Sequence, residues 1–164
     1  MLGRSLLTFA VLAFLSESSM ALDIPAKLAP PAGTKLVGKY AAKGVQIYSC
    51  AAKGTANEWS FKAPEALLTD AKGKVFAKHY AGPNWEAADG SKIAGKAIAN
   101  EPAPKAGAIP WLLLSVESSG SGVLSGARFV QRVNTVGGAG PTGACPTAGS
   151  DKRVDYTADY IIYK

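Results

Sequence analysis

Trp85-Glu86-Ala87-Ala88-Asp89-Gly90-Ser91-Lys92-Ile93 is the stretch of sequence that decides the fold class. Its Asp89-Gly90 pair is the strongest turn signal in the chain, because both central residues of a type I′ hairpin turn need positive φ. The sequence therefore predicts a β-hairpin centred on this pair. A short helix over Lys92 to Ile98 is the alternative, and Gly95 lowers the helix propensity of that segment.

Strand signals recur on both sides of this hairpin, bounded by glycine, proline, asparagine and aspartate at spacings typical of barrels and sandwiches. Polar and apolar residues alternate within them, as expected for strands with one core face and one partly solvated face. The clearest cases are Val45 and Ile47 against Gln46 and Tyr48, and Phe129, Gln131 and Val133 against Arg128, Val130 and Arg132. Predicted strands lie near Gly44 to Cys50, Glu58 to Lys62, Lys74 to Tyr80, Lys92 to Ala99, Ile109 to Val116, Ala127 to Asn134 and Asp155 to Tyr163.

Helical periodicity is scarce. The best candidate is Pro64 to Leu68, where Pro64 can occupy the first helical position. We therefore predict an all-β domain, an antiparallel β-sandwich or closed β-barrel of roughly seven to nine strands with at most one or two short helices. A barrel would offer its interior or mouth to a small apolar ligand, whereas a sandwich would bind through its loops, and the sequence leaves the two open.

The first residues follow the plan of a secretory signal peptide. Arg4 supplies the positive end, an apolar run covers Leu6 to Leu15, and Ser19-Met20-Ala21 provides small residues for cleavage. The run is too short for a membrane-spanning helix, which needs about 20 residues. We expect residues 1–21 to be a signal peptide and residues 22–164 to be a single β domain, secreted or periplasmic, without a transmembrane segment after cleavage. The proline-rich start of that domain should lie extended on its surface.

Cys50 and Cys145 are the only cysteines. In an exported chain their pairing is the simplest interpretation, because disulfides persist in oxidising compartments. Closing the intervening loop would stabilise the fold by roughly 4 kcal/mol in the chain-entropy model. A metal site is disfavoured, because there is no C-x-x-C spacing and His79 is the only histidine that could assist.

The formal net charge of +6 suggests screened, nonspecific affinity for acidic envelope polymers or lipid surfaces. The lysines are spread along the chain without a dense basic run, so a solvated surface is the default explanation. No motif supports nucleic-acid binding. Gly137 to Gly140 does not match a nucleotide-binding loop, because Pro141 follows and no helix opens there. The sequence indicates no cofactor.

Five ordered blocks resemble one family. They are GVQIYSC at Gly44 to Cys50, HYAGPNWEAADGS at His79 to Ser91, IPWLLL at Ile109 to Leu114, QRVNTVGG at Gln131 to Gly138 and YTADY at Tyr156 to Tyr160. The chain resembles a family of exported bacterial and fungal proteins classified as a domain of unknown function. The resemblance implies export and a single domain, and it carries no activity, cofactor or catalytic residue.

His79 is the obvious acid–base candidate, because its ordinary pKa lies near neutrality. Glu86 and Asp89 follow closely and could orient it in a hydrolytic enzyme, with Ser91 as the nearest serine. No G-x-S-x-G nucleophile elbow is present. A histidine that ends a strand and bonds to its neighbours is the simpler interpretation, and an oxygen-ligand calcium site at Glu86 and Asp89 lacks a supporting calcium loop.

Aromatic residues offer a second hypothesis. Trp111, inside an apolar run, is expected in the core, whereas Trp85, between a proline and a turn, is expected to be partly exposed. The leading functional hypothesis is a noncatalytic exported binding module that uses His79, Trp85, Asp89 and Ser91 to hold a sugar, an envelope polysaccharide or a small apolar molecule. A structural or stress-related envelope protein without a ligand is a further alternative.

Overall fold

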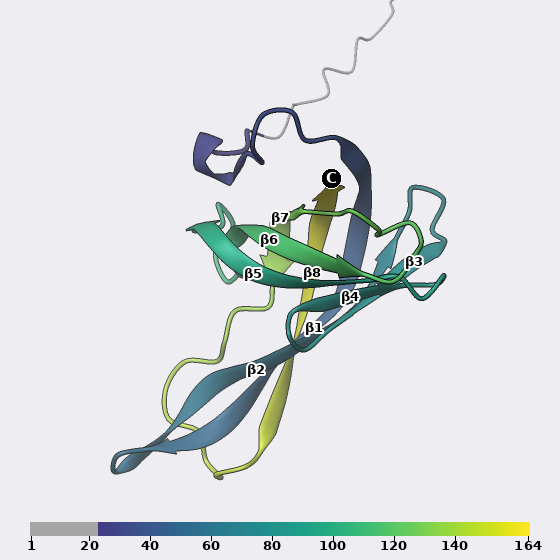
Figure 1. Cartoon of the computed structure of the whole chain (residues 1–164). Helices are drawn as coiled ribbons and strands as arrows, with labels where there is room; N and C mark the ends of the chain where they lie inside the picture. The colour runs from purple at the N-terminus through teal and green to yellow at the C-terminus, as the bar shows by residue number, and fades with distance from the viewer. Residues whose placement is uncertain (1–22) are drawn as a thin grey trace, which may run out of the picture.

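The structure is a computed structural model that describes residues 23–164. Eight antiparallel strands form one sheet, which closes into a barrel because β1 pairs with both β2 and β8 (Figure 1). The strands are β1 (Leu36–Lys53), β2 (Ala56–Thr69), β3 (Val75–Tyr80), β4 (Asn84–Ala87), β5 (Lys92–Glu101), β6 (Trp111–Ser119), β7 (Phe129–Gly137) and β8 (Asp151–Tyr163). The predicted all-β fold is confirmed, and the closed sheet decides between sandwich and barrel. The predicted signal peptide, residues 1–21, lies outside the described residues.

The long strands β1, β2 and β8 project beyond the barrel as an arm (Figure 1). Where the arm begins, the β1–β2 register shifts, because Ile47 pairs with Ala63 while Tyr48 pairs with Phe61. Lys62 is therefore an extra residue in β2, which is a β-bulge, and bulges bend a strand and redirect its side chains. As a result, the adjacent residues Phe61 and Lys62 both border the same cavity.

The predicted helical turn over Pro64 to Leu68 is wrong, because this segment is the middle of β2. Pro64, Ala66 and Leu68 are buried, while Glu65 and Leu67 between them are exposed, which is the two-residue period of a strand. Pairing of β2 with β3 begins only at Ala66. Only one side of β2 is therefore paired at Pro64, and a proline without an N–H is tolerated there.

The hairpin centred on Asp89-Gly90 is confirmed by the pairing of β4 with β5. Its predicted turn type is wrong, because Gly90 has a φ of 85° and Asp89 does not have a positive φ. The Gly90 N–H donates to the Ala87 carbonyl at 3.0 Å, and the Ala87 N–H donates to the Ser91 carbonyl at 2.9 Å. This is a three-residue loop in which only the glycine is left-handed. The alternative helix over Lys92 to Ile98 is excluded, since these residues lie in β5.

The N-terminal segment covers one outer face of the barrel, as predicted, although it contains one 3-10 turn, η1 (Ala26–Leu28). Leu28 is fully buried against Trp111 and Val133. Its carbonyl accepts a hydrogen bond from Gln131 Nε2. Because Val133 and Gln131 lie on the outer face of β7, this segment leaves β7 buried on both faces. No helix among residues 23–164 has the length and apolar character needed to cross a membrane.

Cys50 and Cys145 form the predicted disulfide, with their Cα atoms 5.7 Å apart. The bond holds the β7–β8 connection against the arm, where Glu58 and Ala144 also form an isolated β-bridge. The Tyr48 hydroxyl donates to the carbonyl of Gly138 in the same connection at 2.7 Å. The arm and this connection therefore form one tied unit beside the barrel.

Candidate functional site

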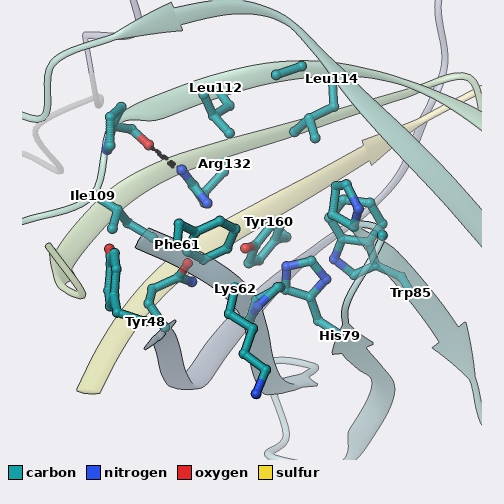
Figure 2. A pocket seen from close by; sticks show the side chains of 16 residues that line it. Tyr48, Phe61, Lys62, His79, Trp85, Ile109, Leu112, Leu114, Arg132 and Tyr160 are labelled. Carbon is teal, nitrogen blue, oxygen red and sulfur yellow. Dashed lines mark hydrogen bonds between the residues drawn. The ribbon is translucent and has the colours of Figure 1, made fainter. Parts of the chain in front are cut away.

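A cavity of about 440 Å³ opens where the arm leaves the barrel, beside the β1–β2 bulge, and we call this end of the barrel the open end. Figure 2 shows the side chains that line the cavity. Its exposed rim consists of Phe61, Lys62, Gly82, Ala97 and Pro110. Its deeper wall is made of buried side chains: Gln46, Tyr48, Pro64, His79, Trp85, Ile109, Leu114 and Tyr160. Sites for small molecules span about 300–1,000 Å³ and are mostly apolar. The size and lining of this cavity lie within that class.

His79, Trp85 and Tyr160 form one aromatic wall of the cavity (Figure 2). The His79 ring stacks on Trp85 with centroids 4.4 Å apart and an interplanar angle of 8°. Tyr160 meets these rings edge-on, at 5.3 Å from His79 and 5.7 Å from Trp85. The expectation that Trp85 is partly exposed is wrong, because its side chain is 1% exposed. Its position in β4, paired with His79 on β3 and with Ile93 on β5, turns it toward the barrel interior.

His79 is held as a neutral imidazole. Its Nδ1 lies 2.8 Å from the Asn84 carbonyl oxygen, which can only accept, so Nδ1 donates and Nε2 is left as the acceptor of the ring. Burial lowers the pKa of His79 to about 4, against the opposing effect of the Asn84 hydrogen bond and with a further lowering by the Arg132 guanidinium. The ring therefore carries no charge at neutral pH.

Two buried donors of the wall have no hydrogen-bond partner within residues 23–164. They are Trp85 Nε1 and Gln46 Nε2, which belong to residues that are 1% and 3% exposed. The Gln46 amide also lies beside the Tyr156 hydroxyl, where it opposes the rise in the pKa of that group that burial causes. Leaving a buried N–H unpaired costs about 1–3 kcal/mol, so such groups are rare in folded proteins and call for a specific explanation. Both residues line the cavity.

Arg132 reaches the cavity from β7, among Leu112, Phe61 and Tyr160 (Figure 2). Its Nε and Nη2 donate to the Pro110 carbonyl oxygen at 3.1 and 2.9 Å. Among the described residues, no ion pair includes this side chain. The guanidinium is thus fixed by a neutral carbonyl and keeps its positive charge without a protein counter-ion.

Asp89 and Ser91 lie at the other end of the barrel, which we call the closed end. The β4–β5 turn that carries them is at the opposite end of β4 from the β3–β4 turn that borders the cavity. The Asp89 carboxylate accepts from the Ser91 hydroxyl at 2.6 Å and from the Val123 N–H at 2.7 Å. The Ser91 hydroxyl accepts from the N–H of fully buried Leu124 at 3.2 Å. These bonds tie two loops together and hold the pKa of Asp89 below its usual value.

Glu86 lies on the outside of the barrel. It accepts from the Tyr80 hydroxyl at 3.1 Å and pairs with Lys92 at 3.2 Å, and these bonds, first that of Lys92, lower its pKa. The Nδ1 of His79 is bonded to a backbone carbonyl rather than to Glu86 or Asp89. The geometry therefore gives no support to the alternative in which either carboxylate orients His79 as a general base. No group of three or more potential metal ligands comes together in the described part of the chain.

Residues 30–164 match the model of a family described as a protein of unknown function, DUF3455. The chain belongs to this family. The match spans the whole barrel together with the arm, so the cavity lies inside the family domain. No curated protein and no solved structure matches the chain significantly.

Sequence reasoning found two of the cavity residues of this DUF3455 domain, His79 and Trp85, and missed Arg132 and Gln46. Alternation placed Arg132 on the same face of its strand as Val130, which is the interior face. The sequence alone gave no signal for either residue, because the apolar neighbours of each made the opposite face of its strand look like the core face.

Proposed function

We propose that this protein is a noncatalytic exported binding module that holds a small, largely apolar ligand in the open end of its barrel. The observation that carries the proposal is a cavity of about 440 Å³ whose buried wall contains two N–H donors without partners. A cavity that only filled space in the core would be lined by apolar groups alone, because unpaired donors destabilise it. A ligand that carries an acceptor would satisfy these donors and bury its apolar surface at the same time.

The burial of Trp85 favours a small molecule over a polysaccharide. A polymer needs an open groove with exposed ring faces, whereas Trp85 and Tyr160 are each 1% exposed and lie below the rim. The adjacent stacked rings give a flat, rigid wall, and aromatic surfaces of this kind pair best with other planar or apolar surfaces. A compact ligand with a planar apolar part fits this wall.

Export is part of the proposal. Its supports are the signal-peptide pattern of residues 1–21 and the Cys50–Cys145 disulfide, because disulfides persist mainly outside reducing compartments. Processing can be checked by comparing the mass of the protein recovered outside the cytoplasm with that of the full chain. A protein that begins near Leu22 supports export, and an unprocessed cytoplasmic protein contradicts it.

Binding can be tested with N-phenyl-1-naphthylamine, a neutral dye whose fluorescence rises in apolar surroundings. The folded protein is expected to bind it with saturable, one-site behaviour. Replacing exposed Ala97 at the rim by tryptophan should fill the entrance and weaken binding at least about 10-fold, since the dye cannot displace a covalently attached ring.

Ile98 provides the matched control, because it is the next residue of β5, is 53% exposed and does not line the cavity. Ile98→Trp adds the same ring at an exposed position that does not line the cavity, and it should leave the affinity unchanged. If the dye does not bind to the native protein, or if the two tryptophan variants weaken binding equally, the open end is not the binding site and the proposal fails.

A further inference from the structure

The polar groups of the cavity wall and rim are mainly hydrogen-bond donors. Trp85 Nε1 and Arg132 can only donate, the Gln46 amide presents an unpartnered N–H, and no aspartate or glutamate lines the cavity. His79 is neutral and therefore adds an acceptor at Nε2 but no negative charge. A ligand that matches this lining must bring acceptor atoms, and a negatively charged one matches it better than a neutral one.

Arg132 is placed to receive that charge. An arginine has five N–H donors, and the Pro110 carbonyl uses one on Nε and one on Nη2. The remaining edge of the guanidinium, between Nη1 and Nη2, keeps two parallel N–H groups, which is the geometry that pairs with the two oxygens of a carboxylate.

The anchor of Arg132 is itself fixed. The carbonyl of Ile109, the residue before Pro110, accepts from the buried Thr135 hydroxyl at 2.6 Å. The Ile109 N–H donates to the Gly137 carbonyl at 2.9 Å. The β5–β6 loop is thus tied to β7, and the guanidinium is held in place before any ligand binds, which reduces the ordering that binding requires.

The other cation at the cavity, Lys62, is already compensated. Its Nζ lies 2.6 Å from Asp151, and its side chain is 54% exposed at the rim. Arg132 is therefore the one charge of the described lining residues without a counter-charge. An uncompensated charge in a partly buried site attracts an opposite charge more strongly than one on the surface, where water and salt screen it.

We propose that the ligand of this cavity is a small carboxylate with a planar apolar body, whose carboxylate pairs with Arg132 while its ring lies against the His79–Trp85–Tyr160 wall. The inference rests on the proposed binding function and narrows its ligand class. It assigns to Arg132 the recognition of charge, and to the aromatic wall the recognition of shape.

Two molecules of nearly equal size test the inference. 1-Naphthoate and 1-naphthylmethanol carry the same ring, with a carboxylate on one and a hydroxymethyl group on the other. Each competes with bound N-phenyl-1-naphthylamine near neutral pH and about 20 mM salt. The carboxylate is expected to displace the dye at a concentration at least about 10-fold lower than the alcohol. Raising the salt to about 500 mM should reduce this ratio, because it screens the ion pair.

Variants locate the charge. In Arg132→Gln, 1-naphthoate and 1-naphthylmethanol should displace the dye at nearly equal concentrations, while the dye itself still binds. Arg132→Lys should retain part of the preference for the carboxylate. Arg128→Gln is the matched control, because Arg128 is exposed, directly precedes β7 and does not line the cavity. Circular dichroism checks that each variant is folded. If Arg132→Gln does not fold, Arg132→Lys and the salt dependence of the native protein test whether Arg132 recognises the carboxylate.

The outcomes separate the two proposals. If the native protein binds the dye but 1-naphthoate and 1-naphthylmethanol displace it at nearly equal concentrations, the proposal of an anionic ligand is wrong and the binding function still holds. A preference that survives in Arg132→Gln but is lost in Lys62→Gln moves the charge recognition to the rim and overturns the assignment to Arg132. Absence of dye binding to the native protein overturns the binding function, and the inference with it.

Discussion

At the closed end of the barrel, the polar groups of the Asp89–Ser91 network have hydrogen-bond partners. At the open end, two buried N–H donors have no partner and one cation has no counter-charge. The Asp89 carboxylate and the Ser91 hydroxyl bridge the β4–β5 and β6–β7 loops over buried Leu124. At the open end, Gln46 and Trp85 hold donors without partners beside a cavity. Folding stability explains the first arrangement. The second is unfavourable for stability, and such exceptions are expected where a protein binds something.

The largest expected effect concerns the tie between the arm and the β7–β8 connection. Replacing Cys50 and Cys145 by alanine should lower the free energy of unfolding by about 4 kcal/mol, because the unfolded chain loses a cross-link across 95 residues. Chemical denaturation measures the loss. The dye affinity should also fall, since Tyr48 is a wall residue that bonds to the same connection. Unchanged stability in the double variant would contradict the structural role of the disulfide.

Acid should weaken the open end through His79. Its pKa is lowered from 6.5 to about 4 in the folded state, so between these values the unfolded chain binds a proton that the folded one does not. Stability due to this group is fully present above pH 6.5 and is lost as the pH falls toward 4, by about 3 kcal/mol at 1.36 kcal/mol per pH unit. Denaturation of the native protein and of His79→Gln at several pH values isolates the effect. Equal pH slopes for the two proteins would contradict it.

Ser91→Ala removes hydrogen bonds only at the closed end of the barrel. It removes a fully buried hydroxyl and leaves the Leu124 N–H unpaired, which should lower the free energy of unfolding by about 1–3 kcal/mol. Because the cavity is at the other end of the barrel, the dye affinity of the folded variant should not change. A loss of binding that exceeds the loss of folded protein would show that the two ends are coupled.

Gln46→Met tests the open end alone and has the smallest expected effect on the free energy of unfolding. It removes an unpartnered buried donor while keeping a similar volume, so the free energy of unfolding should stay unchanged or rise by up to about 1 kcal/mol. Binding of 1-naphthoate should weaken, because a donor to the ligand is lost. A clear loss of stability would mean that the Gln46 amide is satisfied within the fold, and the open end would lose one of its two orphaned donors.

Much of this fold is readable from local sequence. The Asp89-Gly90 hairpin, the alternation in β7 and the cysteine pairing follow from turn chemistry, side-chain period and compartment. Pro64 to Leu68 was misassigned because Pro64 suits the first position of a helix, and only pairing with β1 makes this segment a strand. Local signals do not report such long-range pairing.

Only part of the site could be predicted from the sequence, for a related reason. His79 and Trp85 stand out as residue types, but their partners in the cavity, Arg132 and Tyr160, come from β7 and β8, which are distant in sequence. Asp89 looked like part of the same cluster because it is close in sequence to Trp85. The strand between them carries the two residues toward opposite ends of the barrel, so closeness in sequence did not predict closeness in space.

The contrast between the two ends is tested most directly by the three tryptophan indole N–H signals in a ¹H–¹⁵N NMR spectrum. Trp85 and Trp111 both have a buried, unpartnered Nε1, but Trp111 lies on the outer face beneath Leu28 and Trp85 lies in the cavity wall. On titration with neutral 1-naphthylmethanol, the Trp85 signal should shift in a saturable way while those of Trp111 and Trp59 stay in place. A stationary Trp85 signal, or equal shifts of all three, would contradict a binding site at the open end.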